Sequence, residues 1–527
     1  MDYYNGQEPE QIQLTETAAI LEEEKQKRGS RVPGIFYGLL LLIAGGFFYY
    51  YLLKLNMLPT TFTVLIGVFL GLLVILFMLL GSNSRKIFRC ILGGIFSVGI
   101  AGGLIFGGVL MARVNGAISR ITTPDIVETI EMGVYVRTED PAKTVADTAD
   151  YRFGILEAAD REQTDEVLAA LKKEFGKEPE TVIYDGPLLL LKSLLTGEIS
   201  AAISNRSYLS LAESVDSLKD ITARIRELAV YKMEKAIETK APEETKVPKE
   251  TVAPEETLPE EEESFVSDGN AFAIYISGID DRRGMVARSL SDVNIVAVVN
   301  PKTRNILLLN TPRDYFVQTP VSGEQKDKLT HAGLYGVDVS RQTLEMLYNM
   351  KIDYVFRVDF YGFMDIVDAL GGVDVYSAYD FTAGDCSFVK GTNHVNGYQA
   401  LAFARNRHSF AEGDRQRGKN QMELIKAIMK KAMSTEILSR YNEVLTAVEG
   451  SFETTVPYEL ISSLIRSQVS GGGSWNIVSY SVNGSDGTAS SFTFPEKNYV
   501  MIPDEETVQK AKQLIWDTWR KATVTVN

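Results

Sequence analysis

The chain has 527 residues, 45% hydrophobic and 23% charged, which is enough material for several separate cores. Its 69 acidic and 54 basic residues give a formal net charge of -15, which disfavours binding to the phosphates of nucleic acid. The two cysteines, Cys90 and Cys386, exclude a small disulfide-rich secreted domain.

The N-terminal part carries three uncharged apolar stretches within residues 34–112, at 34–53, 59–80 and 90–112. Each has roughly the 20 residues that a helix needs to cross the hydrocarbon core of a membrane. Basic residues precede the first stretch and lie between the second and third, whereas the first loop holds only Lys54. This asymmetry predicts a multi-pass membrane protein with a cytoplasmic tail, residues 1–33, and extracytoplasmic C-terminal domains, away from the cytoplasmic ATP pool.

Two further segments precede the main soluble domain. Residues 115–235 alternate short apolar runs with a helical pattern at 164–175, which predicts a small α/β accessory domain. It has no glycine-rich phosphate loop, so we assign no chemistry to it, and binding of peptide or sugar remains an alternative. Residues 236–268 contain Pro242, Pro248, Pro254 and Pro259 among many glutamates, which predicts an extended acidic linker; an acidic interaction tail is the alternative.

Residues 270–434 are predicted to form the main soluble domain. Strand patterns at 271–277, 293–300, 305–311 and 353–358 alternate with helical patterns at 339–350, 361–370, 396–405 and 417–433. This alternation indicates an α/β fold built as an α/β/α sandwich. Residues 435–527, with helical patterns at 458–468 and 505–520 and a strand pattern at 476–481, are interpreted as a C-terminal extension packed on this domain.

Two aspartates of this domain suit a hard cation. Asp280 follows one predicted strand and Asp292 begins the next, so the intervening loop can return both carboxylates to one edge of the sheet. Magnesium prefers oxygen ligands and completes its shell with water and substrate phosphate, so two carboxylates suffice. The alternative is that Asp280 ends its strand in a turn and Asp292 is exposed.

Arginines gather after the predicted strands and helices. Arg313 follows the strand ending near residue 311, and Arg405, Arg407, Arg415 and Arg417 surround the loop before the last long helix, with Gln421 four residues beyond Arg417. Guanidinium groups match phosphate oxygens in bidentate fashion, so this cluster in an acidic protein indicates a polyanionic ligand, best a diphosphate. The alternative is a solvated basic start of a helix.

The apolar faces of residues 361–370 and 422–432 are candidates for lining a dry groove, or for an ordinary core. The three histidines, His331, His394 and His408, show no zinc-like spacing. His408, next to Arg407, is a candidate for proton transfer or an ordinary surface residue.

Several motifs in the same order resemble the LytR-CpsA-Psr family. They are Ser277-Gly278-Ile279-Asp280, Ser291-Asp292-Val293-Asn294, Asn300-Pro301-Lys302-Thr303, Thr311-Pro312-Arg313-Asp314, Lys328-Leu329-Thr330-His331-Ala332-Gly333, Asp368-Ala369-Leu370-Gly371-Gly372-Val373, Phe403-Ala404-Arg405-Asn406-Arg407, Gly413-Asp414-Arg415 and Asn420-Gln421. The three spans and accessory domain further resemble the streptococcal CpsA type of architecture.

The resemblance implies a phosphotransferase at the outer face of a Gram-positive membrane, with residues 270–434 as its catalytic domain. Such enzymes move a glycan polymer, teichoic acid or capsular polysaccharide, from a polyprenyl diphosphate carrier to peptidoglycan. Carried over by motif, Asp280 and Asp292 would hold Mg2+, and Arg313, Arg405, Arg407, Arg415, Arg417 and Gln421 would hold the diphosphate. Asp414 and Lys328 would belong to the same site.

One position departs from the family pattern. Relatives commonly have Arg-Ser-Asp where this chain has Leu290-Ser291-Asp292, and the nearest arginine is Arg288. Two alternatives to the transferase remain: a polyprenyl diphosphate hydrolase, in which water replaces the acceptor hydroxyl, and a non-enzymatic membrane regulator of capsule or envelope synthesis.

Overall fold

The computed structural model describes residues 32–81, 87–121, 127–157, 159–213, 215–236, 271–279, 288–434, 436–437, 444, 447–470, 473–494, 496–520 and 524–526. The chain divides into two compact units, Met1–Ser119 with Glu459–Gly472, and Arg120–Tyr458 with Gly473–Asn527. Apart from residues 32, 33 and 236, the predicted cytoplasmic tail and acidic linker lie outside the described residues.

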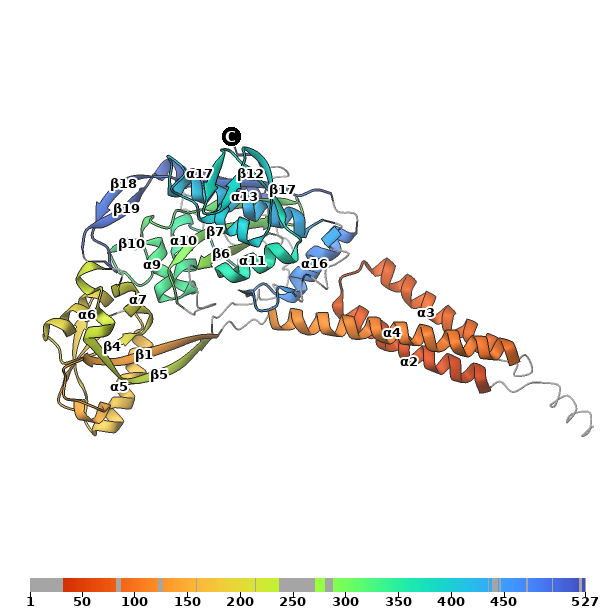
Figure 1. Cartoon of the computed structure of the whole chain (residues 1–527), viewed down its shortest axis with the longest axis horizontal. Helices are drawn as coiled ribbons and strands as arrows, with labels where there is room; N and C mark the ends of the chain where they lie inside the picture. Colours follow the sequence, from red (N-terminus) through yellow and green to blue (C-terminus); the bar gives the residue numbers. More distant parts are fainter. Residues whose placement is uncertain are drawn as a thin grey trace, which may run out of the picture. The chain divides into compact units, whose positions relative to one another are not determined.

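Three long apolar helices form the N-terminal part (Figure 1): α2 (Val32–Leu55), α3 (Thr60–Leu80) and α4 (Ile87–Ile121). Each contains a segment long and apolar enough to cross a membrane, as the sequence predicts. Large apolar side chains such as Phe36, Phe69 and Phe106 are more than half exposed, which suits contact with lipid. The three helices fit the expected membrane anchor.

The expected small α/β domain forms next along the chain. Its sheet has the strand order β3-β2-β4-β1-β5, in which β2 is parallel to β3 and β4, and β1 is antiparallel to β4 and β5. Its elements are β1 (Val127–Arg137), η1 (Val145–Thr148), β2 (Arg152–Leu156), α5 (Arg161–Phe175), β3 (Glu180–Tyr184), α6 (Pro187–Thr196), β4 (Ala201–Asn205), α7 (Ser207–Glu213), η2 (Asp216–Leu218), α8 (Ile221–Arg224) and β5 (Ile225–Ala236). Buried Val134, Phe153, Val167 and Leu171 pack together between sheet and α5.

A six-stranded mixed sheet with the order β16-β11-β6-β7-β8-β17 forms the centre of the second domain. Its strands are β6 (Phe272–Ile279), β7 (Ser291–Asn300), β8 (Asn305–Asn310), β11 (Tyr354–Val358), β16 (Phe452–Thr454) and β17 (Asn476–Ser481). The helices are α9 (Leu329–Ala332), η3 (Gly333–Tyr335), α10 (Val337–Tyr348), α11 (Phe360–Ala369), α12 (Gly397–Arg405), α13 (Asp414–Ala432), α16 (Tyr458–Val469) and α17 (Glu505–Arg520). Short strands complete it: β9 (Phe316–Gln318), β10 (Lys326–Lys328), β12 (Val373–Ser377), β13 (Phe381–Ala383), β14 (Cys386–Phe388), β15 (Gly391–Val395), β18 (Gly484–Ala489) and β19 (Asn498–Pro503).

Helices cover both faces of this sheet, as the predicted α/β/α sandwich requires. On one face, strand residues such as Tyr275 and Leu307 pack with Leu344 of α10 and Leu514 of α17 in a fully buried core. The other face is turned toward α11 and α13, whose side chains meet the strands around a cavity.

The C-terminal residues are part of the sheet, which differs from the extension that we expected for residues 435–527. Strand β17 pairs in parallel with β8, and β16 pairs antiparallel with β11, so both edges of the sheet come from this segment. Val508, Ala511 and Ile515 of α17 belong to the main buried core. A domain cut after residue 434 would expose both sheet edges and an apolar face, because local periodicity does not reveal which strands pair.

The accessory domain is joined to the catalytic domain by a buried ion pair. Arg288, just before β7, pairs through its Nη1 with Oδ1 of Asp160, and their side chains are 5% and 2% exposed. The second oxygen of Asp160 accepts hydrogen bonds from Tyr208 Oη at 2.6 Å and Asn205 Nδ2 at 3.3 Å. Around this pair, Tyr335 and Phe492 of the catalytic domain pack into the apolar core of the accessory domain.

Replacing Asp160 with Asn leaves Arg288 buried without this carboxylate, so we expect the free energy of unfolding to fall by about 3 kcal/mol. Urea unfolding of the full chain in detergent measures the change. The control is Asp165→Asn, which removes an exposed pair with Arg161 and is expected to cost about 0.5 kcal/mol or less. Equal losses in the two variants would show that the interdomain pair contributes no special stability.

Candidate functional site

A cavity of about 840 Å³ lies between the central sheet and helices α11, α12 and α13. Its volume is within the range of small-molecule sites in proteins. Most of its wall is apolar and comes from Ile274, Ile276, Val293, Ala297, Val299, Phe356, Val358, Phe360, Phe363, Ile366, Leu401, Ala402, Leu424, Ile425, Ile428 and Met429. Residues 361–370 and 422–432 thus contribute to both predicted alternatives: Phe363, Ile425 and Met429 line the cavity, whereas Val367, Leu370 and Ala427 lie in a buried core.

The cavity exists because the two faces of the sheet are packed differently. Along β6, Ala273 and Tyr275 point into the filled core, whereas Ile274 and Ile276 point into the cavity, as the two-residue period of a strand requires. Helices α11, α12 and α13 form a separate core with the short strands β12 to β15, which includes Phe381, Phe388 and Phe403. These helices therefore pack part of their apolar surface against the short strands, and space remains between the helices and the central sheet.

Four arginines line this cavity among the described residues: Arg313, Arg405, Arg407 and Arg417. We call the part of the wall that they form with Asp292 and Asp359 the mouth. Arg313 follows β8, Arg405 ends α12, and Arg417 lies in the first turn of α13. Gln421 also lines the cavity, since it lies one helical turn beyond Arg417 on the same face. The structure thus brings together residues that are more than a hundred positions apart in the sequence.

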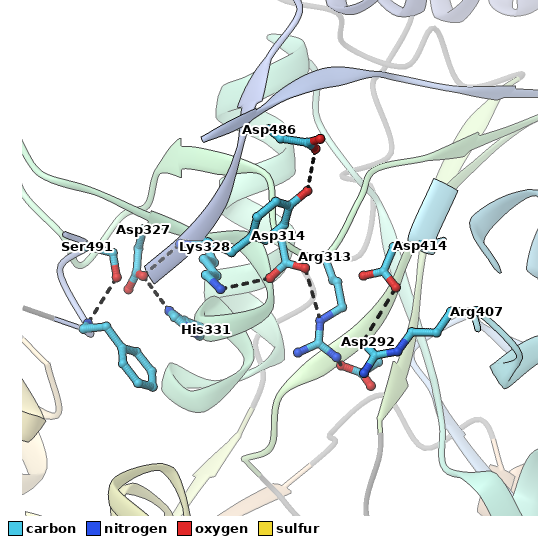
Figure 2. A network of polar contacts seen from close by, with 12 residues as sticks. Asp292, Arg313, Asp314, Asp327, Lys328, His331, Arg407, Asp414, Asp486 and Ser491 are labelled. Atoms are coloured by element: carbon cyan, nitrogen blue, oxygen red, sulfur yellow. Dashed lines mark hydrogen bonds and ion pairs between the residues drawn. The ribbon is translucent and has the colours of Figure 1, made fainter. Parts of the chain in front are cut away.

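Two aspartates hold three of these arginines in place: Arg313 and Arg407 (Figure 2), and Arg417. Asp292 Oδ1 accepts a hydrogen bond from Arg313 Nη1 at 2.5 Å. Asp414 lies 3.8 Å from Arg407 Nη1 through Oδ1 and 3.4 Å from Arg417 Nη2 through Oδ2. Each carboxylate fixes a guanidinium group without covering the whole of its hydrogen-bonding edge, because the guanidinium carries five N–H donors.

The mouth carries more positive than negative charge. Against the four lining arginines stand the carboxylates of Asp292 and Asp359 in the described part of the wall. Burial lowers the pKa of the Arg417 guanidinium, and the carboxylates of Asp414 and Asp292 offset part of this effect. An arginine remains charged at any accessible pH even so, which makes this mouth a site for an anion.

Arg415 and Lys328, which the family resemblance assigns to the site, point away from the cavity. Arg415 Nη2 donates to the backbone oxygen of Gly484 at 2.7 Å and lies 3.6 Å from Asp486, because it is about 200° around α13 from Arg417. Lys328 Nζ pairs with Asp314 Oδ1 at 3.1 Å. Neither Arg415 nor Lys328 contributes to the described wall of the cavity.

Asp280 lies outside the described residues, so of the predicted magnesium ligands the structure describes Asp292 alone. Asp292 lines the cavity with a carboxylate that is 17% exposed. Ile279, the residue before Asp280, lies opposite Ser291 in the antiparallel register of β6 and β7. The described part of β6 therefore ends beside the start of β7, which carries Asp292.

Some site features were not predicted from the sequence. Asp359 caps α11 by accepting a hydrogen bond from Gly362 N at 2.7 Å and also lines the cavity. Asp314 follows Arg313 directly and binds Lys328, a role that its position beside the arginine could have suggested. Arg288 pairs with Asp160 and is not part of the described cavity wall, so in this structure it does not take the place of the arginine missing at Leu290.

The histidines have different environments. His331 is buried, pairs with Asp327 Oδ1 at 2.6 Å and stacks on Phe494. His394 pairs with Asp374 on the exposed surface, and His408 lines the cavity beside Arg407. Within the described ranges, no three side chains of His, Cys, Asp or Glu are arranged to hold a metal ion.

Comparison with known proteins places this site in a family. The model of the LytR_cpsA_psr family matches residues 227–514. The chain is 37% identical over 196 residues to "Polyisoprenyl-teichoic acid--peptidoglycan teichoic acid transferase TagU" of Bacillus mycoides, covering 37% of this chain and 64% of that protein. The matched segment therefore spans less than two thirds of that relative.

A protein of the same name from Oceanobacillus iheyensis is 32% identical over 244 residues, which are 45% of this chain and 73% of that protein. Among solved structures, the crystal structure of B. subtilis TagV aligns with a TM-score of 0.42 and 29% identity, covering 47% of this chain and 97% of that one.

Buried Asp327 gives a prediction for the pH dependence of stability. Burial by itself would raise the pKa of Asp327, but His331 and Thr493 lower it by more, so this pKa lies below its usual value. A lowered folded pKa stabilises the protein above the unfolded value of about 3.9, and this stabilisation is lost as the pH falls through the folded value.

We therefore expect Asp327→Asn to lower the free energy of unfolding by about 2 kcal/mol at neutral pH, and the deficit to shrink below about pH 4. Urea unfolding of both proteins across this pH range measures it. Asp374→Asn, which removes an exposed partner of His394, serves as control. A deficit that stays constant down to about pH 2 would contradict the proposed effect of Asp327.

Proposed function

The chain belongs to the LytR_cpsA_psr family, and on this basis we propose that it is a membrane-anchored phosphotransferase acting on cell-wall polymers. It moves a glycan polymer, teichoic acid or capsular polysaccharide, from a polyprenyl diphosphate carrier to peptidoglycan. Teichoic acid is the polymer in the names of the relatives. The observation that carries the proposal is one cavity with an apolar body and a cationic mouth.

This cavity matches both parts of the proposed donor. A polyprenyl chain is a long hydrocarbon, and the apolar wall between β6, β11, α11 and α13 removes it from water. The diphosphate at its end then lies at the mouth, where Arg313, Arg405 and Arg407 present N–H donors. A ligand without charge would leave the arginines without an anion, and a ligand without hydrocarbon would leave the apolar body unfilled.

Magnesium is the proposed cofactor, and the carboxylates of Asp292 and Asp280 would hold it beside the diphosphate. When bound, it supplies positive charge that stabilises the negative charge developing on phosphate oxygens. Arg313 lies next to Asp292 and contributes a fixed positive charge at the same place.

The reaction transfers one phosphoryl group without ATP. The oxygen of a sugar hydroxyl on peptidoglycan attacks the phosphorus nearest the glycan, and the bond from this phosphorus to the bridging oxygen breaks. The products are a phosphodiester between glycan and peptidoglycan and a polyprenyl monophosphate, and the proton of the hydroxyl passes to solvent. Arg313, Arg405, Arg407 and Arg417 orient the diphosphate and stabilise the charge on its oxygens.

The membrane arrangement agrees with this chemistry. With the basic flanks of the three apolar helices on the cytoplasmic side, the proposed arrangement has the N-terminus inside and the catalytic domain outside, where peptidoglycan lies. The diphosphate linkage of the donor provides the driving force, so the reaction does not depend on a nucleotide from the cytoplasm.

Incubating the full chain in detergent with labelled carrier-linked glycan and peptidoglycan tests the proposal. We expect label attached to peptidoglycan, and an Arg417→Ala variant that is slower by about a hundredfold because it loses a preorganised cation at the mouth. For Arg415→Ala, whose side chain points to Gly484, binding of the carrier-linked glycan is expected within about twofold of the wild type. Free glycan without attachment would indicate a hydrolase, and loss of donor binding in both variants would contradict the assigned geometry.

Removal of divalent ions provides a separate test of the cofactor. We expect a chelator to abolish transfer, added Mg2+ to restore it, and Asp292→Asn to raise the Mg2+ concentration for half-maximal rate by about tenfold or more, because a carboxylate ligand is lost. The control is Glu423→Gln, which changes a half-buried carboxylate of α13 that pairs with Lys426 and does not line the described wall of the cavity. Full activity in the chelator would exclude the metal.

A further inference from the structure

A second group of polar side chains lies beside Arg313 and outside the described wall of the cavity. Asp314 Oδ2 is 3.9 Å from Arg313 Nε, and Asp314 Oδ1 is 3.1 Å from Lys328 Nζ. The Lys328 ammonium lies 5.9 Å from the ring centre of Tyr499, and the Tyr499 hydroxyl donates to Asp486 Oδ1 at 2.9 Å. We call Asp314, Lys328, Asp486 and Tyr499 the Tyr499 cluster.

The backbone holds this cluster firmly against the site. Strands β18 and β19 pair Thr488 with Tyr499 and Asp486 with Met501, which puts Asp486 and Tyr499 diagonally on one face of the hairpin. Met501 N donates to the backbone oxygen of Asp314 at 2.8 Å, so β19 is bonded to the segment that carries Arg313. The position of Tyr499 relative to Arg313 is thereby set by main-chain hydrogen bonds.

The cluster combines an accessible aromatic ring with charged hydrogen-bonding groups. Tyr499 is 45% exposed, whereas the side chains of Lys328 and Asp314 are 14% exposed. Burial and the hydrogen bond to Asp486 raise the pKa of Tyr499 to about 12, so it stays a neutral donor. An aromatic face packs against the C–H face of a pyranose, and carboxylates and ammonium groups bind its hydroxyls, so this combination suits a sugar.

The chemistry of the transfer requires a place for such a sugar. In an in-line displacement at phosphorus, the attacking oxygen approaches from the side opposite the leaving group. The leaving polyprenyl phosphate belongs to the apolar cavity, which Arg313 borders from one side. Figure 2 shows Lys328 and Asp314 on one side of Arg313, and Arg407 and Asp414 on the other.

We propose that the Tyr499 cluster is the subsite for the acceptor sugar of peptidoglycan, with the Tyr499 ring as its platform. This inference rests on the proposed transferase function and adds the location of its second substrate. Asp314 and Lys328 then face the acceptor, and the donor is held by the arginines on the cavity side.

The test uses the full chain in detergent, saturating carrier-linked glycan and soluble peptidoglycan fragments as acceptor. We expect Tyr499→Ala to raise the KM for the fragments about tenfold with kcat changed by about twofold or less, because the ring contact is lost. Tyr499→Phe keeps the ring and is expected to recover most of this affinity. The dissociation constant for the donor, measured without acceptor, reports on the other subsite.

Ile502→Ala is the matched control, since Ile502 is exposed on the same strand three residues on and hence on the opposite face. Wild-type transfer with an unchanged acceptor KM in Tyr499→Ala would overturn this inference and leave the transferase function standing. Weaker donor binding in Tyr499→Ala would also overturn it, by assigning the ring to the donor. Absence of transfer by the wild-type chain would overturn the proposed function itself.

Discussion

The ion pair between Asp292 and Arg313 is the interaction on which the site depends. Strands β7 and β8 pair up to Ile295 and Asn310, and Thr311 N still donates to the backbone oxygen of Asn294 at 2.9 Å, so the segment carrying Arg313 leaves the sheet close to Asp292. Their 2.5 Å contact therefore follows from the hairpin geometry. It places a carboxylate that suits a metal ion beside a guanidinium that suits phosphate, at the mouth of an apolar cavity.

The fold keeps this mouth cationic in a protein whose net charge is -15. In the described part of the chain, four arginines reach the cavity from the end of β8, the end of α12 and the start of α13, and each of these elements belongs to a packed core. Asp414 holds Arg407 and Arg417 without filling the mouth. Because the cavity behind them is apolar, an anion bound there is shielded from water and interacts more strongly with the guanidinium groups.

The accessory domain is part of the same compact unit as the catalytic domain. Its Asp160 pairs with Arg288, four residues before Asp292, and the surrounding aromatic contact joins Tyr208 to Tyr335. A domain that only served as a spacer would not need a buried ion pair with the catalytic domain. The start of β7 is thereby fixed from the accessory side as well as from the sheet.

The sequence by itself determined the three apolar spans, the α/β/α class, and the long helices and the strands β6, β7, β8 and β11 of the catalytic domain, because apolar periodicity is a local property of the chain. It also identified Arg313, Arg405, Arg407 and Arg417 as a cluster, whereas only the tertiary structure separated Arg417 from Arg415, two residues away on the other side of α13. The pairing of β17 with β8 and the pair of Arg288 with Asp160 were likewise decided by tertiary structure. Contacts between residues 128 or more positions apart depend on how whole elements pack, and neither periodicity nor motif spacing records that packing.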